Sequence, residues 1–375
     1  MTPIELLSRL VACPSVNPQN AASFATPLGE AGMVMLLEEL LREWGARVEI
    51  QEVHPSRHNL LATFIGKDPT RAILLDAHTD TVSVDGMIIA PFEPTVRGGK
   101  LYGRGSCDTK GPMTAMLMGL RRVLDRDGKP PVTIYFGATC NEESGATGAS
   151  ALAELLTGDG FSPRPEFALV AEPTDLAIVH THKGAIRLDI TTHGVAAHSS
   201  TPDRGVNAIY KMLPVIQRLE REVLPALGSI KHPQLGSPTL SVGVITGGSQ
   251  VNIVPEWCRI QVDRRLVPGE VRDEVIQQLA GDETFVVTEY YPALEQAVDS
   301  RVSLQIASVC QRTLGRAQFL AAPYATNAGY YQAVGIPSLV LGPGSLSQAH
   351  TKDEFIELSQ LERGVDLFAE IIRSL

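Results

Sequence analysis

Four short apolar runs punctuate the chain, and each ends in polar or acidic residues. Runs of about four to eight apolar residues without alternation are typical of strands buried on both faces, as in a parallel sheet covered by helices. The four runs are AILLDAHTD (72–80), VTIYFGATCNEE (132–143), FALVAEP (167–173) and SLVLGPG (338–344). The pattern therefore predicts a mostly parallel sheet flanked by helices.

Between the first two runs, apolar residues recur at helical spacing. They are Met113, Met116, Leu117, Leu120, Val123 and Leu124, and Gly128 with two prolines supplies a stop. Strand, helix and strand in this order indicate an α/β domain. A second amphipathic helix is predicted at the N-terminus, from Leu6, Leu7, Leu10 and Val11, and it stops near Pro14.

The middle of the chain has a different period. Strands with one wet face are predicted where apolar and polar residues alternate, around 186–190, 240–244 and 260–262. Helices are predicted over 204–222 and roughly 269–280. In the first of these helices the residues expected to face inward are Val206, Ile209, Leu213, Ile216 and Leu219. We therefore expect a small α+β domain with an antiparallel sheet at 178–292, inserted into an α/β domain made of 1–177 and 293–375.

Composition narrows the class of protein. The 375 residues are 44% hydrophobic and 20% charged, which is typical of a soluble globular protein. The net charge of −10 disfavours nucleic acid and anionic membranes as partners. The N-terminus lacks the features of a signal peptide, and no apolar run approaches the roughly 18–20 residues of a membrane span. Five cysteines without a CxxC pair favour a reducing compartment, so a cytoplasmic enzyme is expected.

Chemically active side chains follow the predicted buried strands. Ligand groups gather outside the carboxyl ends of strands in open α/β sheets. The residues at these positions are His78, Asp80, Glu142, Glu143, Glu172 and His350, with Asp108 directly before the helix that follows the first strand. Histidine and carboxylate ligands together suit Zn²⁺, or Co²⁺ or Mn²⁺ in its place. The pattern predicts a metal centre.

Each of these residues alone has a simpler interpretation. A histidine after a strand is usually structural, Asp108 could be the N-cap of its helix, and adjacent glutamates usually form a solvated surface. The metal hypothesis depends on their joint occurrence at the ends of separate strands.

Ordered motifs resemble those of the M20 family of zinc-dependent peptidases and deacylases over nearly the whole chain. The motifs are AHTD (77–80), GRGSCDTKG (103–111), NEESGATG (141–148), AEPT (171–174), GVAAHSS (194–200), VNIVP with VDRR (251–255 and 262–265), and GPGSLSQAHTKDE (342–354). The resemblance implies a catalytic domain interrupted by a smaller lid or dimerisation domain, two divalent metal ions and a homodimer.

The resemblance also implies roles for individual residues. His78 and Glu172 would hold one metal ion, Glu143 and His350 the other, and Asp108 would bridge both. Asp80 would accept a hydrogen bond from the free ring nitrogen of His78. Glu142 would take a proton from the attacking water and pass it to the leaving amine. A cis peptide bond after Asp108 is expected as well.

Four further residues are candidates for contact with the substrate. The resemblance implies that His198 donates to the oxyanion of the tetrahedral intermediate, acting in the partner subunit's site. Arg265 and Asn252 are candidates to hold the substrate's carboxylate, and Asn327 stands where many relatives have an acidic residue. Without the resemblance, His198 could equally be a surface histidine, and Arg265 and Asn252 ordinary residues at strand ends.

Within this family, GPGSLSQAHTKDEF (342–355) and HKG (182–184) resemble the branch that deacetylates N-acetyl-ornithine. The expected function is metal-dependent hydrolysis of the amide of an N-acyl amino acid, with N-acetyl-ornithine or a close analogue as substrate. N-succinyl-diaminopimelate desuccinylase or a carboxypeptidase on short peptides is the alternative within the enzyme class. A non-catalytic ligand-binding relative and a two-metal phosphoesterase remain alternatives from other classes.

Overall fold

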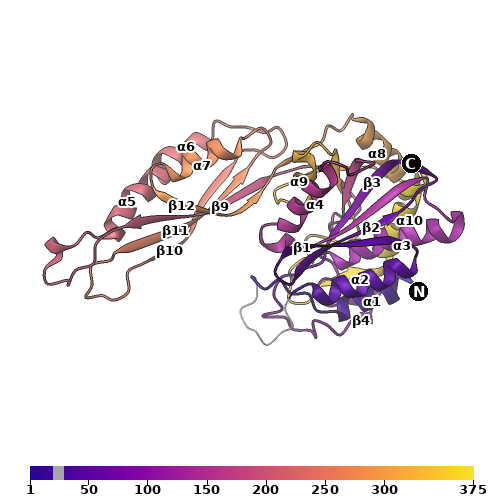
Figure 1. Ribbon diagram of the computed structural model, residues 1–375, viewed down its shortest axis with the longest axis horizontal. Helices are drawn as coiled ribbons and strands as arrows, with labels where there is room; N and C mark the ends of the chain where they lie inside the picture. The colour runs from indigo at the N-terminus through magenta and orange to yellow at the C-terminus, as the bar shows by residue number, and fades with distance from the viewer. Residues whose placement is uncertain (20–28) are drawn as a thin grey trace. The chain divides into compact units, whose positions relative to one another are not determined.

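The computed structural model describes residues 1–19 and 29–375, which form two compact units (Figure 1). The first unit comprises Met1–Thr181, Glu295–Leu320 and Thr326–Leu375. The second comprises His182–Leu294 and Ala321–Ala325. Among the described residues, no helix combines the length and apolarity needed to cross a lipid bilayer.

A nine-stranded mixed sheet organises the first unit, with the order β1-β2-β6-β3-β7-β15-β8-β13 and β14 paired to β8. The neighbours β6, β3, β7 and β15 run parallel, whereas β1, β2 and β8 pair antiparallel. The strands are β1 (Arg47–His54), β2 (Arg57–Phe64), β3 (Asp68–His78), β6 (Val132–Thr139), β7 (Pro165–Val170), β8 (Ile178–His182), β13 (Leu294–Glu295), β14 (Phe319–Ala322) and β15 (Ser338–Val340). The four apolar runs are the four parallel strands, so the α/β prediction is confirmed.

Helices cover both faces of this sheet. They are α1 (Pro3–Ala12), α2 (Ala31–Glu43), α3 (Lys110–Asp127), α4 (Thr147–Thr157), α8 (Arg301–Leu314), α9 (Ala328–Ala333) and α10 (Leu358–Arg373). Figure 1 shows α4 and α9 on one side of the strands and α1, α2, α3 and α10 on the other. A large apolar core joins the second group to Ile73, Leu75 and Ala77 of β3.

Local signals explain where the predicted helices begin and end. Thr2 caps α1 through a capping box with Glu5. Gly128, with a positive φ of 72°, follows the last residue of α3. A separate three-stranded sheet, ordered β16-β5-β4, consists of β4 (Thr95–Arg97), β5 (Lys100–Tyr102) and β16 (Phe355–Glu357).

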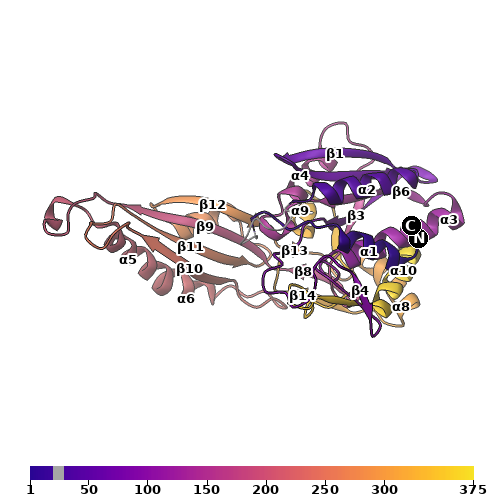
Figure 2. The same cartoon turned by 90° about the horizontal axis from the view of Figure 1, so that it is seen from below.

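The second unit is a four-stranded antiparallel sheet with helices on one face (Figure 2). The strand order is β10-β11-β9-β12, and the strands are β9 (Gly184–His193), β10 (Thr239–Gly247), β11 (Trp257–Leu266) and β12 (Thr284–Tyr291). The helices are α5 (Ala208–Arg218), α6 (Leu224–Leu227) and α7 (Arg272–Ala280). Ile186, Leu188 and Ile190 are buried, and Arg187, Asp189 and Thr191, which follow them in turn, are partly exposed, as the alternation predicts.

The predicted inward face of the first middle helix is only partly correct. The helix begins at Ala208, because the Asn207 side chain accepts a hydrogen bond from the Tyr210 N–H. A π-helical segment, Leu219–Val223, then joins α5 to α6. The side chains that enter the core are Ala208, Met212, Val215, Leu219 and Val223. Of the predicted set, Leu219 is buried and Ile209 and Ile216 pack against this core, but Val206 and Leu213 are exposed.

His182, at the end of β8, makes the stability of the fold depend on pH. Its ring is fully buried, and Nδ1 lies 3.0 Å from the Lys183 carbonyl oxygen. Burial lowers the pKa of His182 from 6.5 to about 4. As the pH falls from 6.5 to 4, the unfolded chain gains a proton that the folded chain does not, so the free energy of unfolding falls. At about 1.4 kcal/mol per pH unit, the loss over this interval is about 3 kcal/mol.

We expect His182→Asn, which does not titrate in this range, to remove that component of the acid sensitivity. Urea unfolding of wild type and variant at pH 7 and pH 4 measures the difference. Equal losses for the two proteins would contradict a neutral His182 in the fold.

Candidate metal centre

The predicted metal ligands meet at the carboxyl ends of the parallel strands. His78 is the last residue of β3, Glu142 and Glu143 form a turn after β6, and Glu172 lies just beyond β7. Asp108 lies just before α3, and His350 lies in the loop between β15 and β16. Parallel strands end at one edge of a sheet, which explains why residues so distant in sequence converge.

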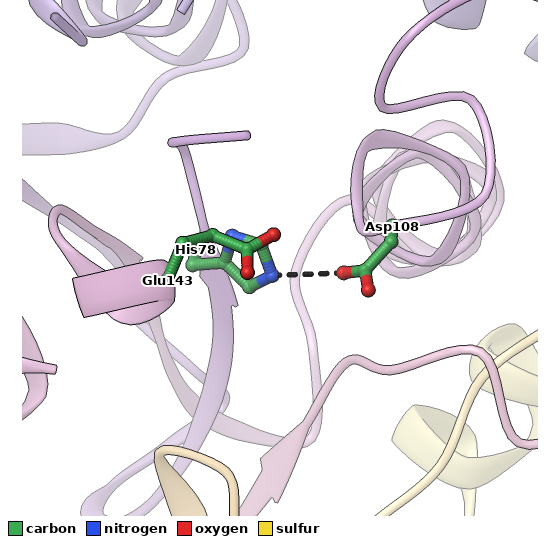
Figure 3. A group of neighbouring side chains, drawn as sticks. All are labelled: His78, Asp108 and Glu143. Carbon is green, nitrogen blue, oxygen red and sulfur yellow. Dashed lines mark hydrogen bonds and ion pairs between the residues drawn. The ribbon is translucent and has the colours of Figure 1, made fainter. Parts of the chain in front are cut away.

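The shortest contacts in the cluster involve both oxygens of Asp108. His78 Nε2 lies 3.1 Å from Asp108 Oδ1, and His350 Nε2 lies 3.2 Å from Asp108 Oδ2. The dashed line in Figure 3 marks the first of these contacts. His350 Nε2 also lies 3.1 Å from Glu143 Oε1. One atom each from His78, Asp108 and Glu143 lie within 4.8 Å of one another. Asp108 therefore faces a different histidine with each oxygen.

The peptide bond between Asp108 and Thr109 is cis, as the resemblance implies. The loop that carries Asp108 is attached to Glu354, a fully buried carboxylate. Glu354 accepts hydrogen bonds from the backbone N–H groups of Gly105, Cys107 and Asp108, at 3.1, 2.9 and 3.0 Å, and from Arg104 Nη1 at 2.6 Å. Glu354 stands four residues after His350, so it ties the two ligand loops together.

Asp80 has a wider role than the one expected for it. His78 Nδ1 lies 3.0 Å from the Asp80 carbonyl oxygen and 3.5 Å from Asp80 Oδ1. The same carboxylate accepts the backbone N–H groups of Glu142 and Glu143, each at 3.0 Å. Asp80 therefore contacts both the histidine and the turn that carries the two glutamates.

Burial and the charged partners act in opposite directions on the pKa values of His78 and Asp108, and the combined effect of the partners sets the net direction. Burial favours neutral Asp108 and neutral His78, but the hydrogen bonds of Asp108 to His350 and His78 hold its pKa well below its usual range. The pKa of His78 is correspondingly well above 6.5, because Asp108 and Asp80 oppose the effect of burial. Hydrogen bonds to Asp108 and Glu143 raise the pKa of His350 to about 11.

The remaining carboxylates repel one another. Desolvation raises the pKa of Glu142 well above 4.5; His78 opposes this effect, whereas Glu143, Asp80 and Asp108 add to it. Burial and Asp108 likewise raise the pKa of Glu172. Glu143 shifts in the same direction, although its hydrogen bond to His350 opposes the shift. Such a concentration of negative charge favours binding of cations.

His198 and Asn252 lie in neighbouring loops of the second unit. His198 forms an isolated bridge with Ile253, and the Ser199 N–H donates to the Asn252 carbonyl oxygen at 3.0 Å. His198 is exposed, and its Nδ1 accepts the Ser200 N–H at 3.1 Å. A neutral ring that accepts at Nδ1 carries its proton on Nε2. His198 therefore presents a donor to solvent.

Arg265 does not lie beside Asn252. It stands near the far end of β11, about 26 Å from Trp257 at roughly 3.3 Å per residue, whereas Asn252 lies in the loop before Trp257. Its guanidinium makes a bidentate contact with Asp263, at 2.7 and 3.1 Å. Within one chain, Arg265 and Asn252 do not form a joint carboxylate site.

Asn327 is enclosed in the first unit. Its side chain is buried, and Nδ2 donates to Asp76 Oδ2 and to Thr139 Oγ1, both at 2.9 Å. Tyr331 donates to the other Asp76 oxygen. The structure therefore places Asn327 in a buried polar network rather than on a surface open to substrate.

Comparison with known proteins identifies the family. Residues 74–374 match the profile of peptidase family M20/M25/M40. The chain belongs to this family. The prediction of an M20-type enzyme, made from the ordered motifs, is confirmed.

Curated M20 relatives match over almost the whole chain. An acetylornithine deacetylase from Klebsiella pneumoniae is 33% identical, with 98% of this chain and 96% of the relative covered. An acetylornithine deacetylase from Photorhabdus laumondii is 34% identical, with coverage of 95% and 92%.

Solved M20 structures share the fold. An M20 family metallo-carboxypeptidase from Sulfolobus solfataricus superposes with a TM-score of 0.79 at 18% identity, covering 100% of this chain and 99% of that chain. A dinuclear metal-binding M20 peptidase from Bacillus subtilis gives a TM-score of 0.68 at 18% identity, covering 99% and 96%.

M20 enzymes are metal-dependent, and the residues of this cluster fit that requirement. Two imidazole nitrogens and several carboxylate oxygens form a mixed N/O donor set, and no thiolate lies at its centre. Such a set is typical of catalytic zinc sites, whereas structural zinc sites are usually rich in thiolates. Burial, with repulsion from neighbouring carboxylates added to it, raises the pKa values of Glu142, Glu143 and Glu172, and bound cations would favour their charged forms. The sequence did not predict the role of Glu354, although Glu354 is the last residue of the motif GPGSLSQAHTKDE. A local sequence pattern does not show which N–H groups a buried carboxylate will accept as hydrogen-bond donors.

Proposed function

We propose that this protein is a deacylase that uses two divalent metal ions to hydrolyse the amide bond of an N-acyl amino acid. N-acetyl-ornithine or a close analogue is the proposed substrate, by similarity to relatives named acetylornithine deacetylase over 95–98% of the chain. The observation that carries the proposal is the placement of Asp108, whose two oxygens face His78 and His350 separately.

The proposed ligand assignment is the one that the resemblance implies, and the contacts of Asp108 and His350 support part of it. His78 and Glu172 would hold one ion, Glu143 and His350 the other, and Asp108 would give one oxygen to each. Zn²⁺ is the proposed metal, with Co²⁺ or Mn²⁺ able to replace it, because all three accept imidazole and carboxylate together. Bound divalent ions supply Lewis-acid polarisation of the scissile carbonyl.

The two glutamates of the turn would have different roles, one as a metal ligand and one as the general base. Glu143 would be the ligand of the pair, which its contact with His350 supports. Glu142 would take the proton of the attacking water and deliver it to the leaving amine. The contacts of Asp80 to both backbone N–H groups support this division, because they fix the direction in which each side chain leaves the turn.

The second unit would act as the lid and dimerisation domain. Two exposed apolar surfaces of this unit support a homodimer. The edge strand β10 exposes Val244 and Ile245, and α5 exposes Tyr210 and Leu213. Edge strands with exposed apolar residues are templates for pairing.

In such a dimer His198 would donate to the oxyanion in the partner subunit's site. Arg265 and Asn252 would serve one substrate only if they came from different subunits, since within one chain they lie at opposite ends of β11. We propose a cytoplasmic location, because five free cysteines suit a reducing compartment.

Amine release from a panel of amides tests the substrate. The panel comprises N²-acetyl-ornithine, N-acetyl-methionine, N-succinyl-diaminopimelate and a simple dipeptide, offered to the zinc- or cobalt-loaded enzyme with Glu142→Gln as the blank. We expect kcat/KM for acetyl-ornithine to exceed the others by about ten-fold or more, which is about 1.4 kcal/mol in transition-state binding. Preference for the succinyl substrate or the dipeptide would retain the hydrolase and replace the substrate.

A further inference from the structure

A buried ion pair stands directly behind the turn that carries Glu142 and Glu143. Arg57, the first residue of β2, pairs with Glu30, the residue before α2. Their side chains are 10% and 0% exposed. Arg57 Nε donates to Glu30 Oε2 at 2.9 Å, and Arg57 Nη2 donates to the other oxygen. A buried pair of this kind adds little net stability over apolar residues of the same volume. Its presence is therefore better explained by a role in positioning neighbouring groups.

Both members of the pair reach Asn141, the residue before Glu142. Arg57 Nη1 donates to Asn141 Oδ1 at 2.7 Å, and the Asn141 N–H donates to Glu30 Oε1 at 3.1 Å. Asn141 has a φ of 64°, in the left-handed region that asparagine tolerates better than most residues. The ion pair therefore holds the side chain and the backbone of the residue that starts the turn.

Asn17 connects this group to Asp80. Asn17 Nδ2 donates to Asp80 Oδ2 at 2.8 Å and to Asn141 Oδ1 at 3.0 Å. The Asn17 N–H donates to the Thr81 carbonyl oxygen at 2.8 Å, which fixes Asn17 beside the end of β3. Asp80 then accepts the N–H groups of Glu142 and Glu143. The hydrogen bonds run without a break from the ion pair to both glutamates.

We propose that Arg57, Glu30 and Asn17 are positioning residues for Glu142 and Glu143. The inference rests on the proposed function, because it assigns a purpose to the orientation of the base and the ligand. Two adjacent carboxylates repel each other, and the turn resists that repulsion only if its backbone is held. Loss of groups that orient metal ligands and their neighbours typically costs about 10–100-fold in metal affinity or activity.

Arg57→Lys is the decisive variant. Lysine keeps the positive charge beside Glu30, but its single nitrogen does not reproduce the planar fork that serves both Glu30 oxygens and Asn141. We expect kcat on N²-acetyl-ornithine to fall about 10–100-fold with KM little changed. Titration with Co²⁺, followed by visible absorption, is expected to show weaker binding of one of two ions and an altered spectrum.

Arg71→Lys is the matched control. Arg71, near the start of β3, makes a bidentate pair with Glu166, at 2.6 and 3.0 Å, in the same unit but away from the strand end that carries His78. This variant is expected to keep wild-type kcat and cobalt binding. If Arg57→Lys does not fold, Asn17→Ser makes the same test, because it removes the side-chain hydrogen bonds that Asn17 Nδ2 donates to Asp80 and Asn141. It also removes the amide oxygen that accepts the Gln19 N–H at 3.0 Å.

The outcomes separate this inference from the proposed function. Wild-type kcat and an unchanged cobalt spectrum in the variant, with only a lower unfolding temperature, would overturn the positioning role and leave a structural ion pair. If the wild-type enzyme hydrolysed no amide in the panel, the proposed function would fail, and the cobalt titration of the variants would still decide the inference.

Discussion

Glu142→Gln is expected to lower kcat about 10²–10⁴-fold, the usual contribution of a general base, while bound metal stays at the wild-type level. Glutamine keeps the size and hydrogen-bonding shape of glutamate but accepts no proton at neutral pH. The metal content should persist because His78, Asp108, Glu143, Glu172 and His350 remain. The metal content of the dialysed variant and its single-turnover rate are measured and compared with those of the wild type.

The apoprotein supplies an independent check. Desolvation and neighbouring carboxylates raise the pKa of Glu142, so the fold opposes its negative charge. Replacing it with neutral glutamine should leave the unfolding temperature of the apoprotein unchanged or higher. Glu143→Gln is the matched variant, and it should lose one metal ion together with activity. Metal loss in step with activity in Glu142→Gln would refute the division of labour.

Glu354→Ala is expected to have the largest effect on stability. It removes the acceptor of three backbone N–H groups and leaves Arg104, whose side chain is 3% exposed, without its carboxylate. Removing one partner of a buried ion pair costs about 3–5 kcal/mol. Urea unfolding of the apoprotein measures the loss, and Zn²⁺ affinity should fall with it because Asp108 is no longer held.

Glu357→Ala is the control for this prediction. Glu357 lies three residues further along, in β16, and its carboxylate, 42% exposed, pairs with Lys100 at 3.2 Å. A surface pair of this kind contributes about 0–1 kcal/mol. If Glu354→Ala cost no more than Glu357→Ala, the hydrogen bonds of Glu354 would not be what holds the Asp108 loop.

The position of the metal centre followed from the order of residues along the chain. Unbroken apolar runs identify strands buried on both faces, and parallel strands end at one edge of a sheet. His78 ends one strand, and Glu143, Glu172 and His350 follow three others, so their meeting required no knowledge of side-chain geometry. The motif order then identified the family, since several motifs in sequence are far more specific than one.

Hydrophobic periodicity did not fully predict the inward face of a helix that carries two apolar stripes. In the helix that begins at Ala208, one stripe, including Met212 and Val215, enters the core, and another, including Tyr210 and Leu213, stays exposed. A hydrophobic pattern indicates which apolar side chains gain from burial, but it does not indicate which part of the protein buries them. The choice between the stripes depends on how the helix rotates against the sheet of its own unit.

The residues that hold the site in place emerged only in three dimensions. Glu30 and Asn141 are 111 residues apart, and Glu354 and Asp108 are 246 apart, yet each pair is joined by a hydrogen bond. Local patterns reflect what a residue's near neighbours require, and hydrogen bonds across the fold leave no period in the sequence. The sequence by itself thus predicts which residues could bind metal and carry protons. Which buried groups orient them is decided by the tertiary structure, because that depends on distances between segments that lie far apart in the sequence.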